Sequence, residues 1–298
     1  MQKHKPVLLD QVIEVLHPGS GEKFIDMTAG YGGHSKKLLS MIGSDGYGYL
    51  IDRDKQAIDK LKKSFKSAAN VQIIKNRFSQ IDKLGLPKVD MILIDLGVSS
   101  AQLDEANRGF SFLKEARLDM RMDRSDRLDA HYVVNNYSQK DLANLIFHYG
   151  EEKKARQIAK SIVESRKVRT IETTIQLANI IAGKIRKTGK INPATKTFQA
   201  IRIEVNNELD ELKKGLENSL KFLGKGGRLA VISFHSLEDR IVKRFIDENS
   251  KETTDITGKV IAQAYLKKVT KKPITGKLES DYNRRARSAK LRAAVKIK

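Results

Sequence analysis

Short apolar runs alternate with helical stretches in the N-terminal third of the chain, and this alternation is the strongest constraint on the fold. The runs expected to be strands cover residues 23–28, 47–51, 71–74 and 89–94. Between them, apolar residues recur every three or four positions, which is typical of helices. Alternating strands and helices predict parallel β-α-β units, and strands that are apolar throughout predict a sheet covered on both faces. We therefore predict an α/β fold built on a Rossmann-like parallel sheet.

A long helical block interrupts this pattern. From Ser138 to about Leu223 the apolar spacing is helical almost throughout. Within the block, one long amphipathic helix is expected to begin after Pro193. Its apolar face is expected to carry Phe198, Ile201, Val205, Leu209 and Leu212.

Strand character returns after the helical block, at residues 228–233 and near 260–269 and 288–297. The helical block is therefore expected to be an insertion into the α/β domain. The predicted domains are an α/β domain formed by residues 1–107 and 222–298, and an inserted all-helical domain over residues 108–221 that recognises the substrate.

Acidic residues stand at the carboxyl ends of the predicted strands. Asp26 ends the first strand and precedes a Gly-rich turn over residues 29–35, while Asp52 and Asp95 end the second and fourth strands. Glycines let a backbone approach a ligand, and a carboxylate after the second strand can accept hydrogen bonds from ribose hydroxyls. Ligands of open α/β sheets bind at this edge. The pattern predicts an adenosine-containing cofactor.

The spacing within the turn narrows the choice of cofactor. Counting from Gly30, Gly32 fills the second position of the dinucleotide fingerprint, but Ser35 stands at the third. No Gly-Lys-Ser or Gly-Lys-Thr follows the turn, which excludes a Walker motif. S-adenosylmethionine has no pyrophosphate to cradle, and its sulfonium cation suits nearby carboxylates better than a phosphate would. We predict S-adenosylmethionine as cofactor, and no catalytic metal because the histidines lack metal-ligand spacing.

The net charge points to a polyanionic partner. The chain carries 57 Lys and Arg against 36 Asp and Glu, a net charge of +21. Residues 267–298 alone hold 12 Lys and Arg against 2 Asp and Glu. Guanidinium and ammonium groups at Arg284, Arg285, Arg287 and Lys290 suit contacts to RNA phosphates, and we favour this over a merely solvated edge strand.

The chain has no Cys, which excludes a disulfide scaffold, a thiolate nucleophile and a Cys-ligated metal. The N-terminus opens no apolar run of signal-peptide length, and no stretch approaches the ~20 apolar residues that span a bilayer. We therefore expect a soluble, cytoplasmic protein with no membrane partner. The oligomeric state is left open, with a homodimer among the alternatives.

Several longer segments between His4 and Arg292 form a specific ordered pattern: His4–Leu9, Gly32–Ser35, Asp95–Asp104, Arg108–Phe112, Leu118–Asp123, Tyr149–Glu152, Thr197–Arg202, Ser233–Arg240 and Ala286–Arg292. With these segments the chain resembles the MraW/RsmH family of 16S ribosomal RNA cytosine-N4 methyltransferases. The resemblance implies a class I methyltransferase sheet interrupted by a helical domain. It implies as substrate a cytosine in the decoding region of 16S ribosomal RNA. Free RNA and the assembled small ribosomal subunit both stay open as the form of the substrate, and contacts over a wide surface favour the subunit.

The resemblance also implies residue roles. It implies S-adenosylmethionine contacts at Gly32, Gly33, His34, Asp52, Phe78, Asp95 and Gln102. Two segments depart from the family pattern. Glu115-Ala116-Arg117 stands where the family usually has Asp-Gly-Pro, which affects the loop before Leu118, and Asn283-Arg284-Arg285 stands where it usually has Asn-Pro-Arg.

A cytosine amine is a poor nucleophile because its lone pair is delocalised into the ring. Catalysis should therefore come mainly from positioning the nitrogen against the methyl group, helped by an acceptor near its N–H. Asp95 is the candidate for this catalytic role, with an N-cap carboxylate as the alternative. The target base must leave its stack, and Phe110 or Phe112 is the candidate to stack on it unless both are core residues. Phe78 is similarly either an adenine neighbour or a core residue.

Three further residues are candidates for RNA contact. Asp119 and Arg121 are predicted to lie in a charged loop that orders around RNA, the alternative being a surface ion-pair network. His235 is expected at the end of the fifth strand, facing the active cleft. Its neighbouring serines do not make a hydrolase, since no Gly-x-Ser-x-Gly elbow is present.

Other functions remain as alternatives. One is an RNA methyltransferase with another target, although a ribose 2′-O enzyme would typically need a lysine near Asp95, and none occurs before Arg108. Another is a non-catalytic RNA-binding protein of ribosome assembly on the same fold. A nicotinamide dehydrogenase is disfavoured by Ser35.

Overall fold

The computed structural model describes residues 6–99, 102–103, 105–184, 192–254, 260–277, 279–281 and 283–298, apart from the side chains of 253–254, 260–262 and 284. Two compact units divide the chain. The first, here called the sheet unit, comprises Met1–Gly97 and Leu209–Lys298. The second, here called the helical unit, comprises Val98–Glu208.

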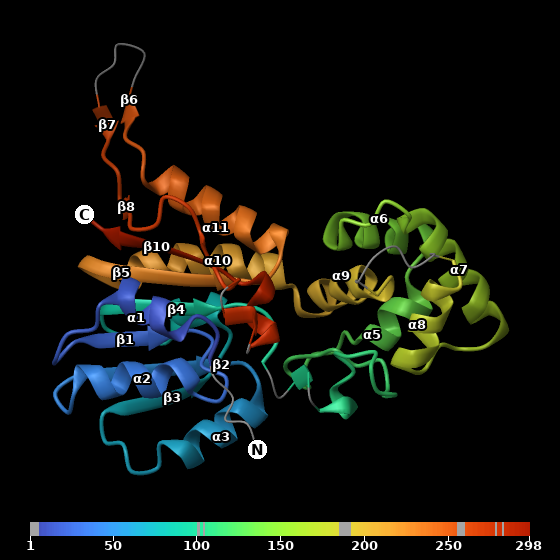
Figure 1. The fold of residues 1–298 in the computed structure, drawn as a ribbon, viewed down its shortest axis with the longest axis horizontal. Helices are drawn as coiled ribbons and strands as arrows, with labels where there is room; N and C mark the ends of the chain where they lie inside the picture. Colours follow the sequence, from blue (N-terminus) through green and yellow to red (C-terminus); the bar gives the residue numbers. More distant parts are fainter. Residues whose placement is uncertain are drawn as a thin grey trace. The chain divides into compact units, whose positions relative to one another are not determined.

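A single large sheet forms the centre of the sheet unit, with strand order β3-β2-β1-β4-β5-β10-β8 (Figure 1). The first five strands in this order pair in parallel, and β10 pairs antiparallel with β5 and β8. The strand order reverses between β1 and β4, which is where ligands bind in such sheets. The strands on this path are β1 (Lys23–Asp26), β2 (Tyr47–Asp52), β3 (Val71–Lys75), β4 (Val89–Asp95), β5 (Leu223–Ser233), β8 (Leu266–Lys268) and β10 (Lys290–Lys296).

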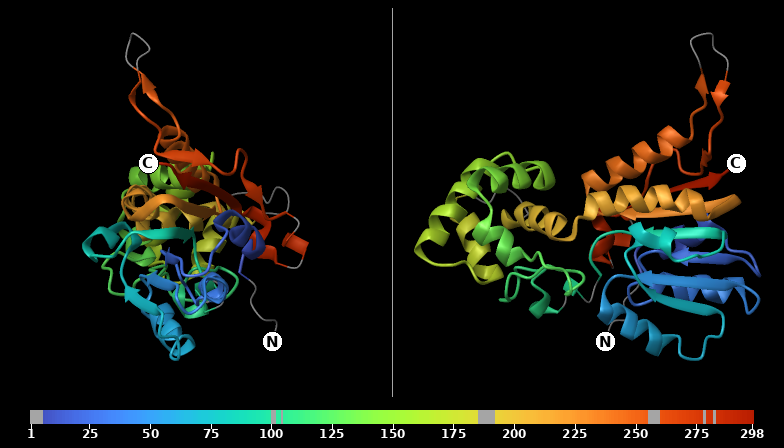
Figure 2. Two further views of the ribbon diagram at one scale, coloured as in Figure 1. Left: turned by 90° about the vertical axis from the view of Figure 1, so that its left-hand side faces the viewer. Right: turned by 180° about the vertical axis from the view of Figure 1, so that it is seen from behind.

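Helices cover both faces of this sheet because the central strands are apolar on both sides. One face packs against α1 (Leu9–Leu16), α2 (Gly33–Ile42) and α3 (Lys55–Ser64). The other face packs against α10 (Glu208–Phe222) and α11 (Ser236–Asn249), and Figure 2 shows both helices in front of the sheet in its right-hand view. This arrangement confirms the predicted α/β fold with a parallel, doubly covered sheet.

The C-terminal tail closes the sheet with short elements. A β9 strand (Ile274–Thr275) also pairs with β10, and β6 (Thr253–Thr254) and β7 (Val260–Ala262) form a separate two-stranded ribbon visible at the top of Figure 1. The short 3₁₀ helices η1 (Phe78–Lys83), η3 (Glu279–Asp281) and η4 (Arg284–Ser288) complete the sheet unit.

The helical unit has its own apolar core. Its helices begin at predictable caps: the side chains of Asp129, Ser138 and Thr173 each accept a hydrogen bond from a backbone N–H in the first turn of the helix that follows. The core is formed by one face of each helix, with Leu142, Ile158 and Ile201 fully buried. Its elements are η2 (Ala106–Arg108), α5 (Ala130–Asn136), α6 (Gln139–Gly150), α7 (Ala155–Val168), α8 (Thr174–Ala182) and α9 (Ala194–Asn206).

The predicted long helix after Pro193 is in fact two helices. Asn207 lies between α9 and α10 with φ 49° and ψ 40°, a left-handed conformation that ends α9. Apolar spacing runs on through the break, so the sequence pattern did not reveal it. The break also shifts the domain boundary, because Leu212 and Leu216 of α10 belong to the core of the sheet unit. Residues 209–221 therefore lie in the sheet unit, and residues 98–107 lie in the helical unit.

Within the described part of the chain, no helix is both long enough and apolar enough to cross a membrane.

Candidate active site

Three carboxylates meet at the carboxyl edge of the sheet, on the adjacent strands β2, β1 and β4. Asp26 is almost fully buried and accepts hydrogen bonds from the Ser35 hydroxyl at 2.5 Å and from the Thr28 N–H at 3.2 Å. Burial raises the pKa of Asp26 to about 6 against the opposing effect of those hydrogen bonds. The turn after β1 is therefore built around this carboxyl group.

Asp52 ends β2 and is tied to the same turn. Its oxygens accept the Gly30 N–H and the Asp54 N–H, each at 2.8 Å. Burial raises the pKa of Asp52 to about 6, although those hydrogen bonds lower it. Half-buried rather than enclosed, Asp52 has the place expected of a carboxylate that binds ribose hydroxyls.

Glycine is required where the turn passes into α2. Gly32 has φ 79°, and a Cβ there would lie 2.6 Å from the Phe65 ring. A Cβ on Gly33 would lie 2.5 Å from the side chain of Pro6. At both predicted cofactor residues the backbone therefore packs closely against neighbouring side chains, and α2 begins at this point with the free N–H groups of its first turn.

Asp95 ends β4, and of the three carboxyl groups it has the fewest hydrogen bonds to its oxygens among the described residues. Its backbone N–H donates to the Thr28 hydroxyl at 2.6 Å, but the buried Oδ1 has no hydrogen-bond partner among the described residues. Burial, together with the negative charges of Asp26 and Glu238, raises the pKa of Asp95 well above its usual value. A buried acceptor without a donor is costly, so this atom is a candidate to receive a ligand hydrogen.

His34 faces Asp95 from the first turn of α2. Its Nε2 lies 3.0 Å from the Val7 carbonyl oxygen, so Nε2 carries the proton of that hydrogen bond. Its Nδ1 lies 3.7 Å from Asp95 Oδ2. With Nε2 protonated, a neutral ring turns its Nδ1 toward Asp95, at a distance longer than a hydrogen bond.

Phe78 begins η1, directly after β3. Its ring packs on α10, where a Cβ at Gly215 would lie 2.3 Å from a ring carbon. The ring remains half-buried, so packing on α10 and contact with a ligand are compatible. Gln102 lies in the helical unit, where its Oε1 accepts the Ser99 N–H at 2.9 Å and its own N–H donates to the Ser99 hydroxyl at 3.2 Å.

The two phenylalanines expected to stack on a base are packed in the core of the helical unit. Phe110 is buried beside Arg108, whose guanidinium carbon lies 5.8 Å from the ring centroid. The Phe112 ring meets Phe198 edge-on with centroids 4.9 Å apart. Burial therefore favours the core alternative for Phe110. Phe112 is half-buried and keeps part of its ring exposed, so it stays a candidate to stack on a base.

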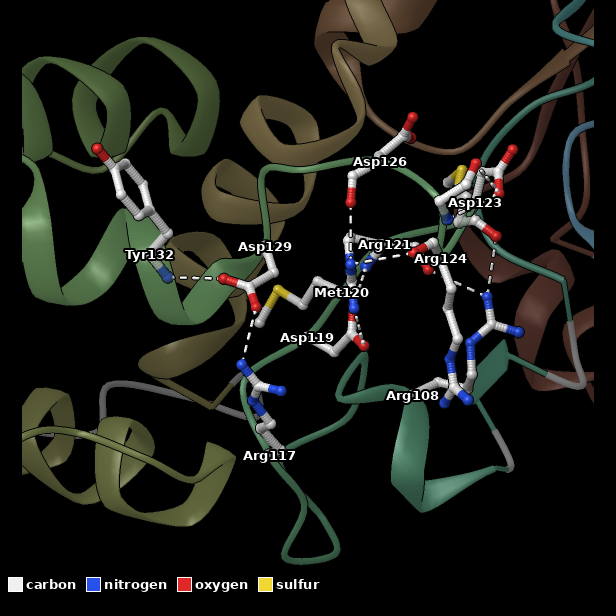
Figure 3. Close-up of polar contacts among 12 residues, drawn as sticks. Arg108, Arg117, Asp119, Met120, Arg121, Asp123, Arg124, Asp126, Asp129 and Tyr132 are labelled. Carbon is white, nitrogen blue, oxygen red and sulfur yellow. Dashed lines mark hydrogen bonds and ion pairs between the residues drawn. The ribbon is translucent and has the colours of Figure 1, made fainter.

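Asp119 and Arg121 form a structural clamp rather than an open charged loop (Figure 3). Arg121 Nε donates to Asp119 at 2.7 Å, and its guanidinium also donates to the carbonyl oxygens of Arg124 and Asp126. Burial would raise the pKa of Asp119, but the hydrogen bonds from Arg121 hold it below its usual value. The pair therefore shapes the segment that follows Leu118.

The same segment is anchored by two residues that the sequence analysis did not select. Arg108 is almost fully buried and donates to the carbonyl oxygens of Arg121 and Met122, each at 3.0 Å. Asn206 accepts the Met122 N–H and donates to the Met120 carbonyl oxygen, each at 2.8 Å. These contacts join residues up to 86 positions apart, so no local sequence signal could indicate them.

His235 is the N-cap of α11. Its Nδ1 accepts the Glu238 N–H at 3.4 Å, and Glu238 in turn accepts the backbone N–H groups of Phe234 at 2.7 Å and His235 at 3.2 Å. This is a capping box, whose signal is the glutamate three residues after the cap. His235 follows β5 as predicted, and its main contacts hold the start of the helix.

The basic tail lies beside α11. Lys290 donates to Asp239 at 3.0 Å, and Arg292 donates to the same carboxylate at 2.7 Å. Arg287 is exposed and Arg285 is half-buried on η4. The backbone of Arg284 lies on the same turn, while its side chain lies outside the described part of the structure.

Comparison with known proteins identifies the family. The family model of the MraW methylase family matches residues 1–297. The chain is 48% identical over 307 residues to "Ribosomal RNA small subunit methyltransferase H" of Caldicellulosiruptor bescii, covering 100% of both proteins. It is 46% identical over 311 residues to the protein of the same name from Clostridium botulinum, covering 99% of both.

Solved structures resemble the chain less. A rRNA methylase from Streptococcus thermophilus matches with a TM-score of 0.42 and 12% sequence identity, covering 97% of this chain and 94% of that one. The family assignment rests on the family model and the near-complete coverage of the two relatives. By both criteria, this chain belongs to the MraW methylase family of methyltransferases.

Proposed function

We propose that this chain transfers a methyl group from S-adenosylmethionine to N4 of a cytidine in the decoding region of small-subunit (16S) ribosomal RNA. Membership of the MraW methylase family and relatives named as small-subunit ribosomal RNA methyltransferases support the reaction class and the RNA. The single structural observation that carries the proposal is the buried, unpaired Oδ1 of Asp95 at the carboxyl edge of the sheet.

The residues present fit S-adenosylmethionine. Asp52 ends β2 half-exposed, where it can bind ribose hydroxyls. Gly32 and Gly33 let the turn beside it pack closely against Phe65 and Pro6. Phe78 follows the next strand with a half-buried ring suited to the adenine. When bound, the cofactor supplies an electrophilic methyl group on a sulfonium cation, whose charge suits the three strand-end carboxylates.

The chain's own contribution to the reaction is positioning and proton acceptance. Because the N4 lone pair is delocalised, the amine must be held in line with the methyl group before it reacts. Asp95 Oδ1 can accept one amine N–H, which orients the nitrogen and draws electron density toward it. As the nitrogen gains the methyl group it loses this proton, and the raised pKa of Asp95 makes its carboxylate a competent acceptor.

His34 supports the position of Asp95. Its ring is fixed by the Nε2 contact to Val7, so Nδ1 lies 3.7 Å from Asp95 Oδ2. That distance is longer than a hydrogen bond, so we assign His34 as a positioning partner of Asp95.

The RNA contact is proposed for the basic tail and for the helical unit. Lys290 donates to Asp239 of α11, and Arg285 and Arg287 lie on η4 just before it. The charge of these residues suits phosphates rather than base edges. We propose that the substrate is the assembled small ribosomal subunit rather than free RNA, and that the reaction takes place in the cytoplasm. The homodimer stays a prediction, which sedimentation analysis would test.

The decisive experiment is methyl transfer from labelled S-adenosylmethionine to unmodified small ribosomal subunits, with nucleoside analysis of the product. Asp95→Asn should lower the rate by ~10²–10⁴, since the amide cannot take the proton. Asp90→Asn is the matched control, because Asp90 lies at the opposite end of the same strand, where it accepts the Lys23 N–H.

Each result assigns a function. Label in N4-methylcytidine, lost in Asp95→Asn and kept in Asp90→Asn, supports both reaction and site. Label in another nucleoside keeps the enzyme class and discards the cytidine. No transfer to subunits or to naked RNA, with S-adenosylmethionine still bound in a calorimetric titration, would favour a binding protein of ribosome assembly.

A further inference from the structure

A cavity of about 280 Å³ opens in the sheet unit where β5 passes into α11. The N-terminal end of α11 forms one side, and the β9 and η4 turns of the tail form the other. Its polar lining includes His235, Ser236, Lys277, Arg287 and Lys290. None of the residues expected to hold S-adenosylmethionine lines it, so the cavity is separate from the proposed cofactor site.

The cavity is electropositive. Lys277 and Arg287 are both exposed and both line the cavity. They lie ten residues apart in the sequence, so it is the fold of the tail that brings the two positive charges to the same cavity. The nearby acids are already engaged. Glu238 is buried in the capping box, and Asp239 is held between Lys290 and Arg292, whose hydrogen bonds keep its pKa below its usual value in spite of burial.

The lining suits one chemical group best. The ammonium of Lys277 and the guanidinium of Arg287 match the charge of a phosphate, and a guanidinium can bind it through two oxygens. The third cation, Lys290, is already paired with Asp239. Ser236, Thr275 and Ser288 line the same space, and residues of this type can donate a hydroxyl hydrogen to a phosphate oxygen. A base would instead need a flat aromatic platform and edge-reading groups, which this lining lacks apart from Phe234.

The position of the cavity relates it to the proposed reaction. In the parallel pair of β4 and β5, Asp95 lies opposite Ile232, and β5 ends one residue later at Ser233. Strands in a sheet lie about 4.8 Å apart. Phe234 and His235, which line the cavity, therefore follow directly after the strand that neighbours Asp95.

We propose that this cavity binds a backbone phosphate of the RNA strand next to the target cytidine. The inference rests on the proposed function and names the part of the substrate that the tail holds. A phosphate fixed here anchors the strand beside the carboxyl edge of the sheet while the target base is out of its stack. Phosphate contacts of this kind set register and orientation without reading sequence.

The test compares two variants that remove the same charge from the same tail. Lys277→Gln/Arg287→Gln empties the cavity of its two exposed cations, and Lys271→Gln/Lys272→Gln removes two exposed lysines that do not line it. Binding of unmodified small-subunit RNA is measured by filter retention over a range of salt concentrations. S-adenosylmethionine affinity and urea unfolding, measured in parallel, establish that each variant is folded.

We expect the cavity variant to weaken RNA binding at least tenfold and to reduce the salt slope by about 0.7, the value for one phosphate on a single strand. The control variant should lose no more than a fewfold. Arg287→Lys should fall between wild type and the double variant, because it keeps the charge and loses the two-oxygen contact. In methyl transfer, the cavity variant should raise KM for the RNA more than it lowers kcat.

Equal losses in the cavity and control variants would overturn the proposal, since Lys277 and Arg287 would then act only through the general positive charge of the tail. Unchanged binding in the cavity variant would overturn it as well. RNA binding does not require methyl transfer, so a wild-type protein that binds through the cavity but methylates no RNA would refute only the proposed reaction.

Discussion

At the scale of single residues, the proposed site is built from buried carboxyl groups whose ionised form lowers the stability of the fold. Asp26, Asp52 and Asp95 lie on three adjacent strands, and burial raises the pKa of each. A raised pKa means that the folded protein binds a proton more tightly than the unfolded chain does. These groups therefore favour folding at low pH and oppose it once they ionise, which is the expected signature of a site kept for a cationic ligand.

Asp26 offers the cleanest measurement of this cost. Its pKa rises from 3.8 to about 6, so the free energy of unfolding should fall as pH rises between these values, by about 3 kcal/mol for this group alone. Asp26→Asn cannot ionise and should lack this pH dependence, although loss of an acceptor for Ser35 or Thr28 lowers its stability at every pH.

Urea unfolding of wild type and variant at pH 4.5 and 7.5 gives the comparison. The difference in free energy of unfolding between wild type and Asp26→Asn should be smaller at pH 7.5 than at pH 4.5. Asp45→Asn, at an exposed position, is the control and should follow wild type. A wild-type to Asp26→Asn difference that stays constant with pH would show that burial does not hold this carboxyl in its neutral form.

The residue scale also shows what a sequence can and cannot predict. Asp26, Asp52 and Asp95 could be selected because each ends an apolar run, and strand ends of a parallel sheet share one edge. The orientation of His34 could not, because it depends on the carbonyl of Val7, 27 residues earlier. Phe110 and Phe112 are aromatic residues near a charged segment, and that pattern does not distinguish a ring in the core from an exposed ring.

At the scale of elements, η1 and α10 are fitted to each other through Phe78 and Gly215. Gly215→Ala adds a Cβ where a Phe78 ring carbon already lies at 2.3 Å, so the ring must move. The gain in helix propensity is about 1 kcal/mol, and crowding typically costs 1–3 kcal/mol, so we expect a net loss of stability of up to about 2 kcal/mol. Because Phe78 is proposed to contact the adenine, S-adenosylmethionine should also bind less tightly.

The control for this prediction is Gly183→Ala, after α8. A Cβ there meets nothing closer than 3.4 Å and the backbone is already helical, so stability should be unchanged or slightly raised. Urea unfolding and calorimetric titration of both variants give the result. If Gly215→Ala weakens S-adenosylmethionine binding but leaves the free energy of unfolding unchanged, the result still supports a contact between Phe78 and the cofactor. Loss of stability with unchanged binding would contradict that placement.

The segment from Arg117 to Asp129 contains two Arg–Asp pairs that differ in burial. Arg121 clamps Asp119 with its side chain 19% exposed, whereas Arg117 meets Asp129 at 3.2 Å with its side chain 63% exposed. Arg121→Lys keeps the charge but loses donors to Asp119 and to two carbonyl oxygens. We expect it to lower the free energy of unfolding by roughly 1–3 kcal/mol.

Arg117→Lys is the matched substitution and should change stability by less than about 0.5 kcal/mol, since exposed pairs contribute little. Differential scanning calorimetry of both variants distinguishes them. Similar small effects would mean that Asp119 and Arg121 are free to serve RNA, as the sequence pattern first suggested. A large effect of Arg121→Lys alone would establish the pair as the support of this segment.

Element boundaries were predictable where a local signal marks them. Caps at Ser138 and Thr173 could be read from residue type, and both begin helices as such residues commonly do. The break at Asn207 has no such mark, because α9 and α10 each place apolar residues at helical spacing on either side of it. Which core each helix joins is decided by packing partners far away in the sequence.

At the scale of the whole molecule, charge is unevenly divided between the two units. The sheet unit holds 37 Lys and Arg against 22 Asp and Glu, and the helical unit holds 20 against 14. The last 32 residues contribute a net +10, most of the excess of the sheet unit. A polyanion should therefore be attracted chiefly through the sheet unit, and near its basic tail.

This distribution predicts that the two ligands respond differently to salt. RNA held through six to ten phosphates should lose affinity by about 10³–10⁵ between 50 and 200 mM salt, because each contact releases condensed counterions. S-adenosylmethionine carries no phosphate and is proposed to bind among carboxyl groups on the strand edge, so its affinity should change only a fewfold over the same range. Filter retention with small-subunit RNA and calorimetry with S-adenosylmethionine, in the same buffers, give both responses. A flat response for RNA would mean that the +21 net charge serves solubility rather than substrate capture, and the role proposed for the tail would then fall while the methyl-transfer site remained.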